Sequence, residues 1–334
     1  MITLSILIPS FNRANKLLRL IKTIESEISR LDIKAQIQLL VSDNGSTDGT
    51  CKMLSEFATA QYKFKYYCQK QNMGFDENIR FLYDKAQTDY VWYIADDDIP
   101  LPGSITTIFQ ALQDRNPDVL LFSFIQPPES NVRQFDFPEP IYSINDPFLA
   151  IKHILRYTKL SIFVMRKINF DNSNWKILDK SLGSGWYYIS LAFSVLEASQ
   201  NLFLAIVSEP LASCDEDYKC ISYSPFPLLY MYKMALHPFV MKHQPNLHKL
   251  YECSGYCQAI QFAFAAKTGS LFPEYIEEYD NFIKELECKM YILWKLPRSL
   301  IQFIALKLRI TGLWPEIKCF TNWVRSVLQV KIIK

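Results

Sequence analysis

The sequence predicts an α/β fold in which a mostly parallel, Rossmann-like sheet is flanked by helices and followed by a helical carboxyl-terminal region. Three observations support this fold. Short apolar runs alternate with segments of helical spacing over the first 125 residues, which is typical of βαβ units. A cluster of polar residues follows four of these runs, and only helical patterns separated by prolines follow Pro225.

Each expected strand of the first part is a short apolar run that ends at a turn or a polar cluster. The first run is apolar nearly throughout, as expected for a strand covered on both faces. Apolar residues then recur at helical spacing before the next run begins. The expected strands are Ile2–Ile8, Gln38–Ser42, Phe64–Cys68, Tyr90–Ile94 and Val119–Phe124.

The pattern is less regular beyond residue 125, where prolines mark a loop region. A strand is expected over Ser161–Met165 and a mostly apolar helix over Gly185–Ala198. We expect two parts of the chain: residues 1–222, with a nucleotide-binding half 1–125 and an acceptor half 126–222, and a helical region 223–334. The expected helices of the last region are Leu228–Met241, Leu247–Lys267, Pro273–Lys295, Arg298–Leu308 and Pro315–Val330.

Composition and charge exclude several classes of protein. The chain has 334 residues, of which 49% are hydrophobic, so intrinsic disorder is excluded. A net charge of +2 is too balanced for a protein that wraps around nucleic acid, and we expect no nucleic-acid partner. The amino terminus lacks the basic leader of a signal peptide, and no run of about 18 apolar residues predicts a membrane span.

Eight cysteines without CxxC pairs favour reduced thiols in a cytosolic protein. Cys253 and Cys257 are four residues apart, so they would share one face of a helix. A zinc site there is the alternative interpretation.

The polar clusters lie where an open α/β sheet binds its ligands, beyond the carboxyl ends of the strands. They are residues 9–13, 42–46, 71–74 and 96–98. Three adjacent carboxylates at Asp96, Asp97 and Asp98 repel one another unless a cation neutralises them, and their oxygens suit Mg²⁺ or Mn²⁺. A solvated acidic turn is the structural alternative. The sequence has no glycine-rich phosphate loop, which favours a sugar-nucleotide site over an ATPase.

Four segments in this part of the chain resemble the ordered motifs of family 2 glycosyltransferases, which have the GT-A fold: LSILIPSFNRANKL, LLVSDNGSTDGT, QNMGFDENI and YVWYIADDDIPLPGSI. The resemblance covers roughly residues 1–125. It implies that Asp43 bonds the pyrimidine edge and that Asn72 and Gly74 shape the pocket floor. The residues implied to line the nucleotide pocket beside them are Pro9, Ser10, Asn12 and Arg13.

The same resemblance assigns the acidic run to a metal ion that would bind the diphosphate. Asp98 is the first expected ligand and would act in catalysis, Asp97 lies beside it, and Asp96 is expected nearer the ribose. Mn²⁺ or Mg²⁺ is therefore the expected cofactor.

The run ADDDIP and the helical carboxyl-terminal third are most similar to the abequosyltransferase-like branch, whose members transfer a dideoxyhexose from a CDP-sugar in O-antigen assembly. A carboxylate at Asp43 can accept from the amine of cytosine or from the imide of uracil, so it does not choose between CDP- and UDP-sugars.

The resemblance is weakest at the general base. Inverting members carry a Glu-Asp pair, whereas the corresponding stretch here, residues 181–188, contains no carboxylate. Asp179 is the expected base, with the cluster Asp215-Glu216-Asp217 as the alternative. A solvated loop acid beside Lys180, or a retaining mechanism without this base, also remains open. The aromatic residues 186–188 are either a platform for a sugar ring or part of the core.

The carboxyl-terminal tail predicts a membrane contact. Residues 289–334 contain nine Lys or Arg and one acid, Glu316, together with three tryptophans. A basic amphipathic helix of this kind binds anionic lipid surfaces, and a helix docked on the catalytic part is the alternative.

Together these features predict a metal-dependent glycosyltransferase on the inner, cytoplasmic face of the plasma membrane. It would use a nucleoside-diphosphate sugar and a lipid-linked oligosaccharide acceptor. A non-catalytic sugar-nucleotide or glycan-binding module is the main alternative. A nucleotidyltransferase is disfavoured because its basic triphosphate loop is missing.

Overall fold

The computed structural model describes residues 2–33, 36–57, 63–125, 141–156, 159–199, 202–214 and 237–243. The chain divides into two compact units, Met1–Ile221 and Ser222–Lys334. Of the second unit, the structure describes the short helix α9 (Pro238–His243) and its preceding residue. The other carboxyl-terminal helices, the basic tail and the alternative base cluster 215–217 lie outside the described residues. Within the described part of the chain, no helix is long and apolar enough to cross a membrane.

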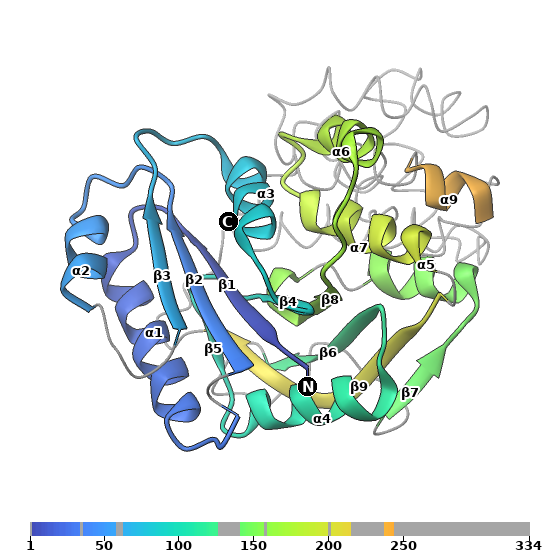
Figure 1. Cartoon of the computed structure of the whole chain (residues 1–334), viewed down its shortest axis with the longest axis horizontal. Coiled ribbons are helices and arrows are strands. Elements are labelled where there is room, and N and C mark those ends of the chain that lie inside the picture. Colours follow the sequence, from blue (N-terminus) through green and yellow to red (C-terminus); the bar gives the residue numbers. More distant parts are fainter. Residues whose placement is uncertain are drawn as a thin grey trace, which may run out of the picture. The chain divides into compact units, whose positions relative to one another are not determined.

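The first unit is built around one mixed sheet, whose strands follow the order β3-β2-β1-β4-β8-β6-β9-β5, with β7 paired to β9 (Figure 1). The strands are β1 (Leu4–Ser10), β2 (Ile37–Asp43), β3 (Lys63–Cys68), β4 (Tyr90–Tyr93), β5 (Asp98–Pro100), β6 (Val119–Ile125), β7 (Ile141–Ile144), β8 (Phe163–Arg166) and β9 (Leu204–Cys214).

Helices cover both faces of this sheet. In Figure 1, α1 and α4 lie on one side of the sheet, and α3 and α7 lie on the other. The helices are α1 (Ala14–Ile28), α2 (Thr50–Phe57), α3 (Phe75–Lys85), α4 (Ser104–Arg115), α5 (Pro147–Arg156), α6 (Asn172–Leu178) and α7 (Tyr187–Ala198), with 3₁₀ turns η3 (Leu160–Ile162) and η4 (Asp179–Ser181).

The central strands are buried because helices cover them on both sides. All seven residues of β1 and all seven of β2 are buried, which explains their nearly continuous apolar sequence. The edge strand β3 instead alternates between exposed and half-buried residues. In α1 the buried residues repeat every three or four positions and form one apolar stripe: Leu17, Leu20, Ile21, Ile24 and Ile28.

The order of the strands reverses at β1, and this reversal positions the site. β1 pairs in parallel with β2 on one side and with β4 on the other, so the chain order reverses at this point. In α/β sheets, ligands bind at such a switch point, outside the carboxyl ends of the strands. Beyond β4 the sheet continues with antiparallel pairs to β8, and β5 and β7 run antiparallel to β9.

The expected fold class is confirmed, with shifted boundaries. The first strand ends at Ser10, two residues after its expected end, because Pro9 and Ser10 still pair with β2. Pro9 is tolerated there because β4 pairs only with Leu4–Leu7, so β1 has no strand partner on that side at Pro9. The strands β5 and β7 were not predicted, because they are only three and four residues long.

Candidate active site

The end of β1 and the acidic run after β4 form one hydrogen-bonded cluster. Ser10 donates its hydroxyl to Asp96 at 2.7 Å, and Arg13 Nη1 lies 2.8 Å from the other oxygen of Asp96. The same nitrogen lies 2.7 Å from Asp97. Burial raises the pKa of the Asp96 carboxyl, while Arg13 and the Ser10 hydroxyl oppose this rise. Two regions more than 80 residues apart therefore meet at the switch point of the sheet.

Asp98 lies deeper and has a different set of neighbours. Its side chain is 1% exposed, and Lys159 Nζ lies 3.1 Å from Oδ1. The hydroxyl of Ser161 donates to Oδ2. Burial raises the pKa of Asp98 to about 6, with Asp97 raising it further and Lys159 lowering it. The protein thus supplies two cations, Arg13 and Lys159, to a run of three carboxylates.

Ser161 also fixes the loop that carries the acidic run. Its hydroxyl accepts the backbone N–H of Ala95 at 3.0 Å, and its carbonyl accepts Trp92 Nε1 at 2.8 Å. Lys159 and Ser161 were not predicted as parts of the site because they lie about 60 residues beyond the acidic run. Their sequence context, an expected strand start, carried no signal for such a role.

The loops after β1 and β2 are joined by hydrogen bonds around Asn12. Its backbone N–H donates to Ser46 Oγ at 2.8 Å, and its side-chain oxygen accepts the N–H of Thr47 at 2.8 Å. Asn12 has φ of 54°, a left-handed conformation that asparagine tolerates better than most residues. Its side chain therefore holds the two loops together.

Asn44 joins the loops after β2 and β3. Its side-chain nitrogen donates to Asn72 Oδ1 at 3.0 Å and to the Gly74 carbonyl at 3.1 Å, and its oxygen accepts the Met73 N–H at 3.0 Å. Its backbone N–H donates to the Ser10 carbonyl. The position of Asn44 in the turn after β2 was visible in the sequence, but its bridging role was not.

Gly45 allows these loops to approach closely. It has φ of 75°, and a Cβ atom there would overlap the backbone of Gln71. The adjacent Asp43 is buried at the end of β2, and its Oδ1 accepts the N–H of Ser46 at 3.1 Å. The structure thus brings the four predicted polar clusters to one edge of the sheet.

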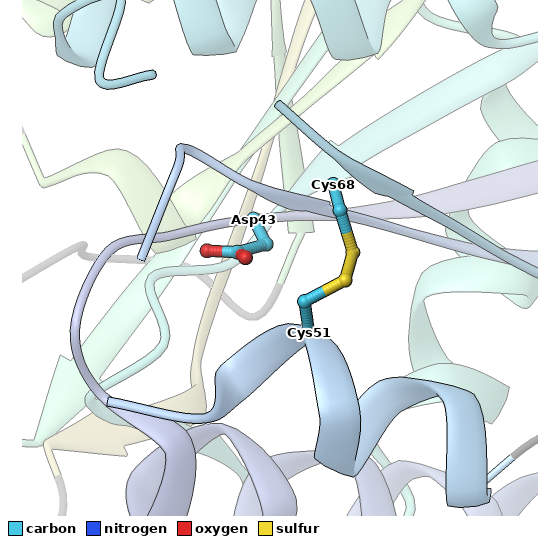
Figure 2. A group of neighbouring side chains, drawn as sticks. All are labelled: Asp43, Cys51 and Cys68. Carbon is cyan, nitrogen blue, oxygen red and sulfur yellow. A yellow bond between two sulfur atoms is a disulfide. The ribbon is translucent and has the colours of Figure 1, made fainter. Parts of the chain in front are cut away.

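Cys51 and Cys68 form a disulfide beside Asp43, so the expectation of reduced thiols is wrong for this pair in this structure. Figure 2 shows the bridge running from the start of α2 to the end of β3, with the Asp43 carboxylate next to it. Sequence spacing gave no indication, because the two cysteines are 17 residues apart and meet only through the βαβ topology.

Asp76 links α3 to the start of α7. This residue is 3% exposed, and it accepts the backbone N–H groups of Gly185 at 2.8 Å and Tyr187 at 3.2 Å. The hydroxyl of Ser184 lies 3.3 Å from the same carboxyl. Burial raises the pKa of Asp76 although these donors oppose the rise. Asp76 therefore caps the amino terminus of α7 from another helix, and no local pattern predicts this cap because the contact spans over 100 residues.

Asp179, the expected base, lies in the 3₁₀ turn η4 and contacts Arg80 of α3. Its Oδ1 is 3.3 Å from Arg80 Nε, and both side chains are 36% exposed. The Arg80 guanidinium lies 5.3 Å from the centre of the Trp175 ring. Tyr187 and Tyr188 are buried and belong to the core, whereas Trp186 is half-buried and tilted against Tyr188.

Within the acidic run, Asp97 is better placed than Asp98 to bind a hard divalent cation. Carboxylate oxygens are the ligands that Mg²⁺ and Mn²⁺ prefer. Asp97 is 24% exposed and can turn an oxygen toward solvent, whereas the Asp98 Oδ1 atom is buried against Lys159. A metal ion at Asp98 would have to displace that lysine.

The family follows from a comparison with known proteins. Residues 5–176 match the family model described as Glycosyl transferase family 2. The chain belongs to this family. The matched segment begins in β1 and ends in α6, so it includes all four polar clusters and the Lys159–Ser161 segment.

Two relatives have named activities. A GalNAc(5)-diNAcBac-PP-undecaprenol β-1,3-glucosyltransferase of Campylobacter jejuni is 31% identical over 108 residues, which are 32% of this chain and 33% of that enzyme. The abequosyltransferase RfbV of Salmonella typhimurium is 26% identical over 236 residues, covering 64% of this chain and 67% of that enzyme. The chain therefore matches only a third of the length of the first and two thirds of the second.

Solved structures show the same fold. S. aureus TarS 1–349 in complex with UDP-GlcNAc has a TM-score of 0.61 at 13% identity, covering 99% of this chain and 92% of that one. The mannosyltransferase PcManGT of Pyrobaculum calidifontis, in complex with GDP-Man and Mn²⁺, has a TM-score of 0.50 at 11% identity and covers 99% of this chain and 86% of that one. These similarities establish the GT-A fold of the first unit.

Proposed function

We propose that this protein is a glycosyltransferase that moves a sugar from a nucleoside-diphosphate sugar to a lipid-linked oligosaccharide. One observation carries the proposal: Ser10 and Arg13 at the end of β1 contact Asp96 and Asp97 after β4, beside the buried Asp43. A nucleotide in this position would meet Asp43 at its base, Asp96 at its ribose and Asp97 at its diphosphate.

In this proposal Asp97 is the first metal ligand and Asp98 the second. This order reverses the one expected from sequence, because Asp98 contacts Lys159 and Ser161. A bound Mn²⁺ or Mg²⁺ would supply Lewis-acid stabilisation of the departing diphosphate. Arg13 orients Asp96 and Asp97, and Asn12 and Asn44 fix the loops around the base.

The donor belongs to the CDP- or UDP-sugars. The similarity to RfbV supports CDP-abequose or a related dideoxyhexose, and the TarS complex with UDP-GlcNAc supports a UDP-sugar. The lipid-linked acceptor is supported by the undecaprenol-linked substrate named for the Campylobacter relative. Contact of the basic tail with an anionic membrane at the cytoplasmic face belongs to the same proposal. Flotation with anionic liposomes tests it, and unchanged binding after truncation at Lys289 contradicts it.

Asp179 stays our proposed general base. Because Arg80 contacts its carboxylate, Arg80 would hold this group in place for the acceptor hydroxyl. Asp179→Asn should lower kcat while leaving donor binding unchanged. An unaffected kcat would assign the base elsewhere or favour a retaining reaction.

The decisive experiment is a thermal-shift panel of UDP, CDP, GDP and dTDP with Mn²⁺, followed by donor turnover. A nucleotide that binds only the folded state raises the melting temperature, so the panel identifies the base. Asp97→Asn should abolish the Mn²⁺-dependent shift and the turnover, while Asp114→Asn, at an exposed site on α4, should change neither. Full turnover in excess EDTA would contradict the metal role.

A non-catalytic sugar-nucleotide module is the second candidate, and one observation favours it: the stretch of residues 181–188 contains no carboxylate. Binding of a nucleotide without hydrolysis or transfer of any donor would support this alternative.

A further inference from the structure

The end of β2, the end of β3 and the start of α2 place three metal-binding side chains together. Asp43 is the last residue of β2 and Cys68 the last of β3, and the two are paired in register on adjacent parallel strands. Cys51 lies in the first turn of α2. The two sulfur atoms and a carboxylate oxygen of Asp43 all lie within 4.8 Å of one another (Figure 2). Among the described residues, this is the group of three such side chains close enough to share an ion.

We propose that Cys51, Cys68 and Asp43 form a binding site for a thiophilic divalent cation such as Zn²⁺ once the disulfide is reduced. Occupation of this site would withdraw Asp43 from the nucleotide base. This consequence rests on the role of Asp43 in the proposed function, whereas the metal site itself does not. The disulfide in the structure is then the oxidised, metal-free form of the site.

Common small-molecule thiols can convert the disulfide into the reduced form that binds the ion. Two small-molecule thiols reduce the disulfide by exchange, which yields the Cys51 and Cys68 thiols and one small-molecule disulfide. Zn²⁺ then replaces the two thiol protons, which are released to solvent, and the Asp43 carboxylate completes a three-ligand site with water as the fourth ligand. Cys68 is exposed and Cys51 half-buried, so both a reductant and the ion can reach the pair from solvent.

The backbone distances suit such a site. Zinc–sulfur bonds of about 2.3 Å in a tetrahedral site place two sulfurs about 3.8 Å apart. The Cα atoms of Cys51 and Cys68 are 5.8 Å apart, so side-chain rotation alone can open the sulfurs to this separation. The hydrogen bonds of Asp43 support the coupling to nucleotide binding. Its Oδ1 accepts the Ser46 N–H, and its backbone carbonyl accepts the Gln69 N–H. A carboxylate turned toward a metal at Cys68 would weaken the first of these bonds and change the loop after β2.

A zinc titration of the full chain tests the site directly. The protein is reduced with a phosphine, and excess Mg²⁺ is added to occupy the acidic run. Zn²⁺ binding is then measured by competition with a chromogenic chelator. We expect Cys51→Ser and Cys68→Ser each to lose one high-affinity Zn²⁺ per chain, and Asp43→Asn to bind it at least about tenfold more weakly. The double variant Cys253→Ser/Cys257→Ser should keep this ion, and oxidation of the wild type with a small disulfide should abolish its binding.

Nucleotide affinity is measured in parallel on the reduced protein. Saturating Zn²⁺ should weaken the binding of the preferred nucleoside diphosphate to the wild type and leave Cys51→Ser unaffected. Equal Zn²⁺ stoichiometry in the wild type, Cys51→Ser and Cys68→Ser would overturn the proposed site. Unchanged nucleotide affinity in the zinc-loaded wild type would overturn the coupling. If no nucleotide binds even without zinc, the proposed function fails, while the zinc titration still decides the site.

Discussion

Burial of Asp98 should make the stability of this protein depend on pH in a way that one substitution removes. The carboxyl is 1% exposed, and burial raises its pKa from 3.8 to about 6. The folded state therefore binds this proton more tightly than the unfolded chain does. The resulting stabilisation is fully present below pH 3.8 and is lost as the pH rises through 6.

The size of the effect follows from the pKa shift. A rise from 3.8 to about 6 corresponds to about 3 kcal/mol of unfolding free energy. Asp98→Asn keeps the shape of the side chain but cannot titrate. Because the unfolded carboxyl is already more than half ionised at pH 4, the unfolding free energy of the wild type minus that of Asp98→Asn should fall by about 2 kcal/mol between pH 4 and pH 7.5.

Urea unfolding in EDTA at several pH values, followed by circular dichroism, measures this difference. Asp114→Asn, at an exposed site on α4, is the matched control and should show a much flatter difference. Lys159→Met removes the cation that lowers the pKa of Asp98, so the pH window should move upward. A difference between wild type and Asp98→Asn that stays constant from pH 4 to pH 7.5 would refute the reasoning.

Three further substitutions test other parts of the site. Asp76→Ala removes the acceptor of two backbone N–H groups at the start of α7, so it should cost about 1–3 kcal/mol and speed hydrogen exchange in residues 184–187. Gly45→Ala should destabilise the protein by more than about 1 kcal/mol in urea unfolding, and clearly more than Gly49→Ala, because both glycines have positive φ but only Gly45 lies against a neighbouring backbone. Ser161→Ala removes a hydrogen bond to Asp98 that lowers its pKa, so the pH window measured for Asp98 should move upward.

The candidate site was partly predictable because its chemistry is local in the sequence. Each polar cluster follows a recognisable apolar strand, and the carboxyl ends of neighbouring parallel strands lie at one edge of a sheet. Ser10, Arg13, Asp43 and the acidic run could therefore be assigned to one site. The contacts among Ser10, Arg13, Asp96 and Asp97 agree with that placement.

Other parts of the site depend on residues with no local signal. Lys159 and Ser161 reach the acidic run because β8 pairs with β4, a contact that no spacing in the sequence encodes. Asp76 reads in sequence as one more acid at the start of a helix. Its role as a cap for α7 depends on how α3 packs against that helix.

The sequence by itself determined the fold class, the strands β1 to β4 and β6, and the polar clusters near their ends, because apolar periodicity and turn residues act over a few positions. Only the tertiary structure decided which carboxylates lie against a basic side chain. Arg13 lies between Asp96 and Asp97, and Lys159 lies against the buried Asp98. Tertiary structure also joined Cys51 to Cys68 beside Asp43. Contacts of this kind depend on the distances between strands and helices that are far apart along the chain. These distances determine which charges pair and which thiols can form a disulfide.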